Sequence, residues 1–289
     1  MTTLRDVFRL MRPAHWLKNA FVGLALFFAG QFDLPSILLV LVGMAAFSAI
    51  SSAVYIINDI CDAPGDRLHE RKKMRPIASG AVSVPLGWGV AFLLIIISVV
   101  IDFIFFNKWQ TLILLLGYLF INILYSLKGK NIPILDVLIL SGGFMLRMFY
   151  GALLLDSFIT NWLYLTVLSI SLYMALGKRR NELNKYGEDA GNVRKVLSSY
   201  TTNFLDKNMY VFLTLSILFY ALWTMHMYDQ GGRGAYAIWT TPLVIVICMR
   251  YSLITETRQF ADPVEILLND KTLIGLIIFY GLIMGAIII

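Results

Sequence analysis

The chain has 289 residues, of which 58% are hydrophobic and only 15% are charged, and its mean hydropathy is +0.74. A soluble domain carries about 25% charged residues, so this composition excludes an ordinary soluble protein and indicates a polytopic membrane protein. The net charge of +6 requires no nucleic-acid partner, because the cytoplasmic side of membrane proteins is basic and meets anionic membrane lipids.

Nine segments are apolar and long enough to cross about 30 Å of hydrocarbon, although the first and the sixth are short. The sequence therefore predicts an all-α fold of about nine transmembrane helices, with residues 1–289 forming a single domain. In chain order, the predicted spans are 15–31, 35–58, 85–106, 110–126, 134–155, 161–177, 209–228, 236–254 and 271–289.

The distribution of charge predicts the orientation. All but three of the 24 Lys/Arg residues fall at the N-terminus or in alternate connections, and the exceptions are Lys108, Arg147 and Arg233. The positive-inside rule places the N-terminus in the cytoplasm and the C-terminus outside a cell (inner) membrane. Fourteen of the 18 acidic residues lie on the same side, which topology does not require. These acids predict a cytoplasmic active site in loops near 58–84, 126–134 and 178–208.

The first polar stretch, residues 58–80, reads NDICDAPGDRLHERKKMRPIASG. On a helix, Asn58, Asp62 and Asp66 would share one face, one turn apart. Pro64–Gly65 predicts that the helix ends before Asp66, so that this acid comes from a turn. The candidate catalytic acids here are Asp59, Asp62 and Asp66.

Clustered carboxylates repel one another unless cations neutralise them. Mg²⁺ prefers oxygen ligands and is usually bound by one or two carboxylates together with substrate phosphates. We expect Asn58, Asp62 and Asp66 to hold Mg²⁺. Neighbouring bases would meet phosphate oxygens, and those retained as substrate-binding candidates are Arg67, Lys73 and Arg75. The alternative is an ionic loop whose acids and bases pair with each other.

The stretch NDICDAPGD resembles the first Asp-rich motif of the UbiA superfamily of intramembrane prenyltransferases, and the following HERKKMRPIASG is similar to the same family. The chain departs from the commoner H-P-x-K pattern because Glu70 follows His69. The resemblance implies nine transmembrane helices around a central cavity that opens to the cytoplasmic face.

Three further stretches resemble the decaprenyl-phosphate phosphoribosyltransferase subgroup: RPAHWLKN (12–19), YSLKGKNIPILDVLILSGGFMLRMFYGA (125–152) and GKRRNEL (177–183). The resemblance implies a donor, 5-phosphoribosyl 1-diphosphate, an acceptor, polyprenyl phosphate, and release of diphosphate. Two other functions remain open. One is UbiA-type transfer of a polyprenyl group from its diphosphate to an aromatic or other small acceptor, and the other is a transporter whose acids gate ions. The oligomeric state is also open, a homo-oligomer included.

Most of the remaining candidate residues also have a structural alternative. Lys18 would bind a phosphate or snorkel to the interface, and Tyr125 would bond a ribose or phosphate oxygen or serve as an interfacial aromatic. The second polar stretch is YSLKGKNIPILDVLILSGGFMLRMFYGA (125–152), and Lys128 and Lys130 flank the second site within it. Asp136 would complete the metal shell or receive a ribose hydroxyl, or else act as a helix-start carboxylate.

Arg147 follows Asp136 by eleven residues, on almost the same helical face and about 16 Å deeper in the membrane. A charge at this depth usually faces the bundle interior, so Arg147 would serve a cavity or form a structural pair. At the end of the sixth span, Lys178 and Arg179 would face phosphate while Glu182 fixes one of them. The alternative is that these charges only set the topology.

Overall fold

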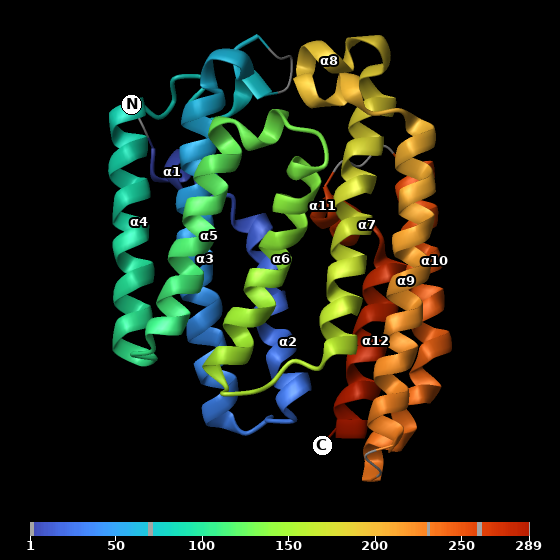
Figure 1. Ribbon diagram of the computed structural model, residues 1–289. Coiled ribbons are helices and arrows are strands. Elements are labelled where there is room, and N and C mark those ends of the chain that lie inside the picture. Colours follow the sequence, from blue (N-terminus) through green and yellow to red (C-terminus); the bar gives the residue numbers. More distant parts are fainter. Residues whose placement is uncertain (1–2, 69–71, 230–231, 259–261, 289) are drawn as a thin grey trace. The chain divides into compact units, whose positions relative to one another are not determined.

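In the part of the chain that the structure describes, every regular element is a helix (Figure 1). The computed structural model describes residues 3–68, 72–229, 232–258 and 262–288. The α-helices are α1 (Leu4–Leu10), α2 (Ala20–Ala29), α3 (Leu34–Asp66), α4 (Val84–Phe105), α5 (Trp109–Leu127), α6 (Leu135–Leu154), α7 (Asn161–Tyr186), α8 (Ala190–Val193), α9 (Thr202–Asp229), α10 (Thr241–Thr257), α11 (Pro263–Asn269) and α12 (Lys271–Ile288). Short 3₁₀ helices connect them: η1 (Pro13–Asn19), η2 (Lys72–Met74), η3 (Gly129–Asn131), η4 (Gly187–Asp189), η5 (Lys195–Ser199) and η6 (Gly232–Thr240).

Several long helices begin at a polar capping residue. The Asp33 side chain accepts hydrogen bonds from the amide of Ser36 at 2.9 Å and from its hydroxyl at 2.8 Å, and α3 starts there. Ser83 and Thr160 cap α4 and α7 in the same way. Such caps satisfy amide groups that have no partner inside the helix, and they fix where each apolar segment starts.

The chain divides into two compact units. The first comprises Met1–Leu26, Asp33–Ile132 and Leu146–Ser157. Within it, α4 and α5 both pack against α3. Its core includes Leu10, Ile56 and Leu94, which are buried from three different helices.

The second unit comprises Phe27–Phe32, Pro133–Met145 and Phe158–Ile289. Helix α7 packs along α9, and α12 packs against η6 and α10. One core cluster of this unit includes Leu176, Leu197 and Leu205 and therefore joins α7, η5 and α9.

Seven helical segments in the part of the chain that the structure describes are long and apolar enough to cross a membrane. They match seven of the predicted spans, and η6 and α10 together form one of them. The predicted span 15–31 is divided between η1 and the ten-residue α2. Helix α7 is long enough, but it is not among the seven. The count of nine spans therefore stays a prediction.

One boundary prediction was wrong. Contrary to the prediction, helix α3 does not end before Asp66 but continues through Pro64, and Asp66 is the last helical residue. The amide of Arg67 still donates to the carbonyl of Ala63 at 3.2 Å, so the helical pattern resumes directly after the proline. Asp66 is therefore placed by the helix and not by a turn.

Candidate active site

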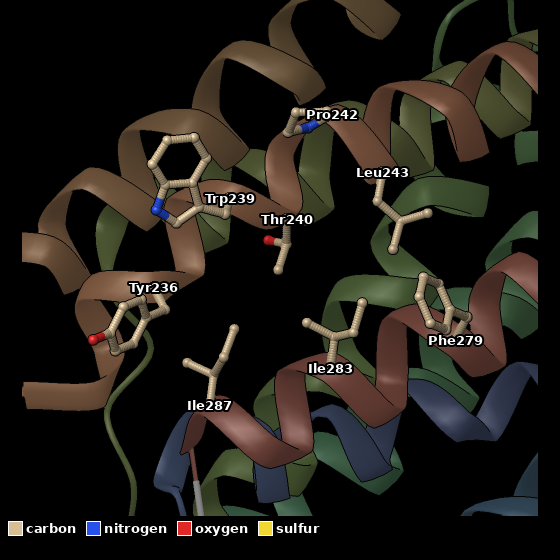
Figure 2. A pocket seen from close by; sticks show the side chains of 8 residues that line it. All are labelled: Tyr236, Trp239, Thr240, Pro242, Leu243, Phe279, Ile283 and Ile287. Atoms are coloured by element: carbon tan, nitrogen blue, oxygen red, sulfur yellow. The ribbon is translucent and has the colours of Figure 1, made fainter.

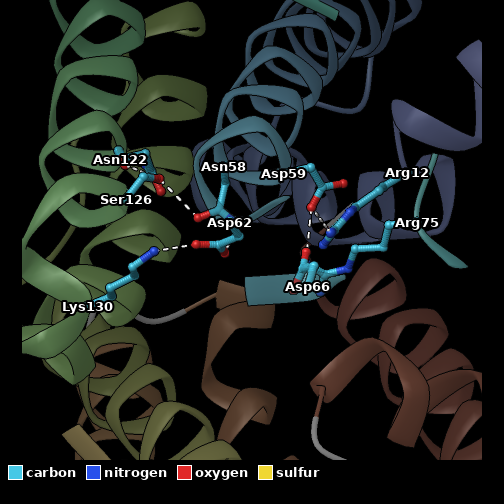
Figure 3. A network of polar contacts seen from close by, with 9 residues as sticks. All are labelled: Arg12, Asn58, Asp59, Asp62, Asp66, Arg75, Asn122, Ser126 and Lys130. Carbon is cyan, nitrogen blue, oxygen red and sulfur yellow. Dashed lines mark hydrogen bonds and ion pairs between the residues drawn. The ribbon is translucent and has the colours of Figure 1, made fainter. Parts of the chain in front are cut away.

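The three aspartates of the first polar stretch, Asp59, Asp62 and Asp66, lie on the last two turns of α3, where they form two groups (Figure 3). Asp59 and Asp66 are seven residues apart, which is close to two helical turns and puts them on one face. Asn58 and Asp62 are four residues apart and share the adjacent face. The prediction that Asn58, Asp62 and Asp66 lie together on one face is thus wrong, because Asp66 is grouped with Asp59 and Asp62 is grouped with Asn58.

The first pair is neutralised by two arginines. Nη1 of Arg75 donates to Asp59 Oδ1 at 3.2 Å and to Asp66 Oδ2 at 2.6 Å. Nη2 of Arg12 donates to Asp59 Oδ1 at 2.5 Å, and its guanidinium lies 5.3 Å from the ring centroid of Tyr55. Both carboxylates are buried, so their charges depend on these cations.

The second pair lies among neutral and basic groups of α5 and η3. Asn58 Nδ2 donates to Asp62 Oδ2 at 2.9 Å. The Ser126 hydroxyl oxygen lies 3.1 Å from Asn58 Oδ1 and 2.9 Å from the backbone carbonyl of Asn122. Lys130 forms an ion pair with Asp62. Three carboxylates on α3 are therefore matched by three basic side chains from other parts of the first unit.

The donor chemistry of this cluster fits a divalent cation. One nitrogen of Arg75 lies within hydrogen-bonding distance of both Asp59 and Asp66, so a single positive centre can contact both carboxylates. Carboxylate oxygens are the ligands that Mg²⁺ prefers. Over the described ranges, however, no three acidic, histidine or cysteine side chains already converge as a metal centre. Binding a metal ion here would require Arg75 to move from between the acids.

Apart from Arg147, the other predicted substrate-binding residues of the first unit are exposed or partly buried. Arg67 is exposed, and its Nε donates to the backbone carbonyl of Ala78 at 3.3 Å. Two further side chains are exposed: Lys73 and Lys128. Two are partly buried: Lys18 and Tyr125. His69 and Glu70, which carry the departure from the family pattern, lie outside the described residues.

Arg147 is buried in the first unit. Its Nε donates to Asn19 Oδ1 at 2.8 Å, and its Nη2 donates to the hydroxyl of Tyr118 at 3.0 Å. Its guanidinium carbon lies 4.9 Å from the ring centroids of both Phe47 and Tyr118. Aromatic faces and neutral oxygens thus stabilise the positive charge at this depth.

A second polar cluster lies in the second unit, around Asp136 at the start of α6. Asp136 is fully buried, and it accepts from Nε of Arg179 at 2.5 Å and from the hydroxyl of Tyr200 at 2.6 Å. The Tyr200 oxygen also accepts from the amide of Ile134 at 2.7 Å. Ile134 has a φ of 69°, which is strained for a β-branched residue, so Tyr200 helps to fix the turn that leads into α6.

The predicted group at the end of α7 surrounds this cluster. Glu182 accepts from Nη1 of Arg179 at 2.6 Å, as expected for an acid that fixes one of the bases. Arg194 lies 3.8 Å from the same carboxylate, and Lys178 lies 3.7 Å from Asp262. Arg179 is fully buried between two acids, so a phosphate would contact it only by displacing one of these carboxylates, and its predicted role stays a prediction.

Burial raises the pKa of the Tyr200 hydroxyl to about 12, and its hydrogen bond to the Asp136 carboxylate adds to the shift. Tyr200 therefore stays protonated at physiological pH and can act as a donor to Asp136. No motif or spacing in the sequence pointed to Tyr200. Arg12 was also not among the predicted site residues, although it lies inside a stretch that carries the family resemblance. Lys130 was expected beside the second site, but its ion pair with Asp62 was not predicted.

The second unit also contains an apolar pocket of about 550 Å³ between η6, the start of α10 and α12 (Figure 2). It is lined by Tyr236, Trp239, Thr240, Pro242, Leu243, Phe279, Ile283 and Ile287. None of these side chains is charged, so the pocket suits hydrocarbon and lacks the groups that would hold a phosphorylated substrate.

Fold and site together define a multi-pass helical membrane protein with an acidic cluster at the end of a spanning helix. The model of the UbiA prenyltransferase family matches residues 18–264, and the chain belongs to this family.

Curated relatives include two proteins named decaprenyl-phosphate phosphoribosyltransferase. The Corynebacterium glutamicum protein is 32% identical, with 92% of this chain and 81% of the relative covered. The Mycolicibacterium smegmatis protein is 31% identical, with 92% and 86% covered. Among solved structures, a UbiA homolog from Archaeoglobus fulgidus bound to GPP and Mg²⁺ has a TM-score of 0.70 at 19% identity, with 98% of this chain and 96% of that chain covered. This structural likeness shows that the fold is shared.

Proposed function

We propose that the protein transfers a 5-phosphoribosyl group from 5-phosphoribosyl 1-diphosphate to a polyprenyl phosphate of decaprenyl type, in a Mg²⁺-dependent reaction that releases diphosphate. The observation that carries the proposal is the pair Asp59 and Asp66, held around a single cationic nitrogen of Arg75. Similarity to the two named phosphoribosyltransferases over 92% of the chain supports the choice of substrates.

In this proposal Asp59, Asp62 and Asp66, assisted by Asn58, hold Mg²⁺. The bound ion stabilises negative charge on the departing diphosphate. Arg75, displaced from between the carboxylates, is then available to contact phosphate oxygens. Arg12 stays with Asp59 and limits the negative charge of the cluster.

The chemistry needs no strong general base. The attacking group is the phosphate of the acceptor lipid, which is anionic at pH 7 because the second pKa of a phosphate monoester is about 6. Substitution at the anomeric carbon passes through an oxocarbenium-like state, and the enzyme would act mainly by positioning and by electrostatic stabilisation. Asp136 and Tyr200 are proposed to position the second polar stretch, whose exposed Lys128 would meet the donor.

We also propose the arrangement in the membrane. Nine spans form one domain around a central cavity that opens to the cytoplasm, with the N-terminus and the acidic cluster on that side and the C-terminus outside a cell membrane. A soluble, highly anionic donor would then reach the cluster from the cytoplasm, while the acceptor lipid arrives from the bilayer. A reporter fused to the C-terminus should register outside, and a cytoplasmic signal would overturn the nine-span count.

The activity is tested with purified protein in nanodiscs, radiolabelled 5-phosphoribosyl 1-diphosphate, polyprenyl phosphate and Mg²⁺. The proposal expects label in a butanol-extractable lipid, and no label when EDTA replaces Mg²⁺. Asp62→Asn should remove this product, while Asp33→Asn, at the opposite end of the same helix, should retain it. Absence of labelled lipid, together with consumption of a polyprenyl diphosphate and an aromatic acceptor, would favour the prenyltransferase alternative.

A further inference from the structure

Asp102 is a buried acid inside a spanning helix, and neither the sequence analysis nor the proposed function uses it. It lies on α4 of the first unit, and only 1% of its surface is exposed. A carboxylate in such surroundings is costly unless a cation or several hydrogen bonds compensate for the lost water.

The partners of Asp102 are two hydroxyl groups from neighbouring helices. The Tyr150 hydroxyl of α6 lies 2.9 Å from Oδ1, and the Thr111 hydroxyl of α5 lies 3.0 Å from Oδ2. The closest base in sequence, Lys108, donates instead to Asp156 at 2.7 Å and to the carbonyl of Leu153 at 3.0 Å. Within the described part of the chain, no ion pair involves Asp102.

The hydrogens around Thr111 can be counted. A threonine hydroxyl has one proton to donate and lone pairs with which to accept. The Thr111 oxygen lies 2.7 Å from the backbone carbonyl of Lys108, which can only accept, so the proton of Thr111 belongs to that shorter bond. The contact between Thr111 and Asp102 Oδ2 then lacks a proton unless the carboxyl group supplies one.

We propose that Asp102 binds a proton and is a neutral carboxylic acid in the folded protein. Its Oδ2–H group donates to Thr111 Oγ1, and its Oδ1 accepts from the Tyr150 hydroxyl. This arrangement satisfies every polar atom of the group without placing a charge in hydrocarbon, and it links α4, α5 and α6 by directional bonds.

The proton site is separate from the acidic cluster of α3. Thr111 and Ser126 lie near opposite ends of α5, about 22 Å apart along the helix axis. Ser126 contacts the acidic cluster through Asn58, whereas Thr111 contacts Asp102. A failure of the proposed transferase activity would therefore leave this inference unaffected.

The surroundings of Asp102 contribute little charge. Helix α6 supplies the titratable Tyr150, and the Lys108–Asp156 pair follows the ends of α4 and α6. Helix α3 contributes the apolar ring of Phe47, whose centroid lies 5.5 Å from that of Tyr150.

Infrared difference spectroscopy of wild type against Asp102→Asn tests the protonation state directly. The proposal expects the carbonyl stretch of a protonated carboxylic acid in wild type at neutral pH, shifted in D₂O and lost in the variant. A spectrum in which the variant loses only carboxylate bands would overturn it.

A pair of variants provides an independent test. In Asp102→Asn, the amide nitrogen can donate to Thr111 while the amide oxygen accepts from Tyr150, so the midpoint of thermal unfolding in nanodiscs should match wild type. Asp102→Leu leaves both hydroxyls without this partner and should lower the midpoint by about 5 °C or more. If Asp102 were instead ionised, Thr111 and Tyr150 would both donate to it. The amide nitrogen of the substituted side chain would then face one of these hydroxyl donors, and the variant would be destabilised. A loss in Asp102→Asn as large as in Asp102→Leu would therefore contradict the proposal.

Discussion

Asp59 and Asp66 accept hydrogen bonds from the same nitrogen of Arg75, at 3.2 and 2.6 Å. Two buried acids that share one cation would repel each other if that cation left without replacement. The relationship therefore links the ion-pair network of α3 to the proposed metal site, because Mg²⁺ and Arg75 compete for the same two carboxylates.

Removing the negative charge of Asp66 should strongly reduce turnover while leaving the fold intact. Asp66→Asn retains a hydrogen-bond acceptor for Arg75 but weakens the proposed binding of Mg²⁺. The rate of phosphoribosyl transfer to the lipid should therefore fall about 100-fold or more. The measurement is the rate of label incorporation at saturating donor. Asp33→Asn is the matched control on α3, and equal losses in both variants would refute a specific role for Asp66.

The competition between Arg75 and Mg²⁺ predicts a change in ligand-induced stability. Without the guanidinium of Arg75, the Arg75→Gln variant should unfold at a lower temperature than wild type in EDTA, because Arg12 alone then compensates the two buried carboxylates. Added Mg²⁺ should raise the midpoint more in the variant than in wild type. Thermal unfolding across a Mg²⁺ titration measures this difference. Equal shifts in the two proteins would argue against a metal ion between these acids.

Two glycines of α6 should respond differently to the same substitution. A Cβ at Gly151 would lie 2.2 Å from the backbone oxygen of Val22, so this glycine permits the close approach of α2 and α6. Gly151→Ala should therefore destabilise the protein by about 3 kcal/mol. At Gly142, no atom lies within 4 Å of an added Cβ, so Gly142→Ala should be neutral or slightly stabilising. Midpoints of thermal unfolding compare the pair.

The raised pKa of Tyr200 predicts that the protein loses stability at alkaline pH. Burial, followed by the bond to Asp136, raises its pKa to about 12, above the value of about 10 in an unfolded chain. The folded state therefore binds this proton more tightly, and the resulting stability is full below pH 10 and is lost as pH rises towards 12. The difference in unfolding midpoint between wild type and Tyr200→Phe should be constant from about pH 6 to 9 and then shrink. A constant difference up to pH 12 would show that Tyr200 is not perturbed.

The pair Arg179 and Asp136 should behave as a coupled unit. Arg179→Met leaves two acids without their central base, and we expect a loss of about 3–5 kcal/mol. Adding Asp136→Asn removes one uncompensated charge, so the double variant should be more stable than the sum of the two single losses indicates. A double-variant cycle of unfolding free energies measures the coupling, and strict additivity would contradict the buried pairing.

Local sequence could place most of the helices. Seven predicted spans correspond to apolar helical segments, because hydropathy is a property of neighbouring residues and needs no tertiary information. The boundary at Pro64 was mispredicted for the converse reason. Proline disfavours a helix interior on average, but α3 continues to Asp66, whose side chain is held by Arg75.

The acids of the candidate site could be found from their spacing, but their partners could not. Asp59 is bound by Arg12, which precedes it by 47 residues, and Asp62 by Lys130, which follows it by 68. The helical period also led to a wrong grouping. Asn58, Asp62 and Asp66 were predicted to share one face, whereas Arg75 binds Asp59 and Asp66, which are seven residues apart. Asp102 falls inside the predicted span 85–106, but a lone acid has no spacing motif, and its partners Thr111 and Tyr150 follow it by 9 and 48 residues.

By itself, the sequence determined the membrane character, the helical class and the family, because these rest on composition, on apolar segments and on short ordered motifs. Only the tertiary structure decided which charge neutralises which. Ion pairs depend on the meeting of helices distant in sequence, and in a medium of low polarity the partner of each charged group decides whether that group can remain charged at all.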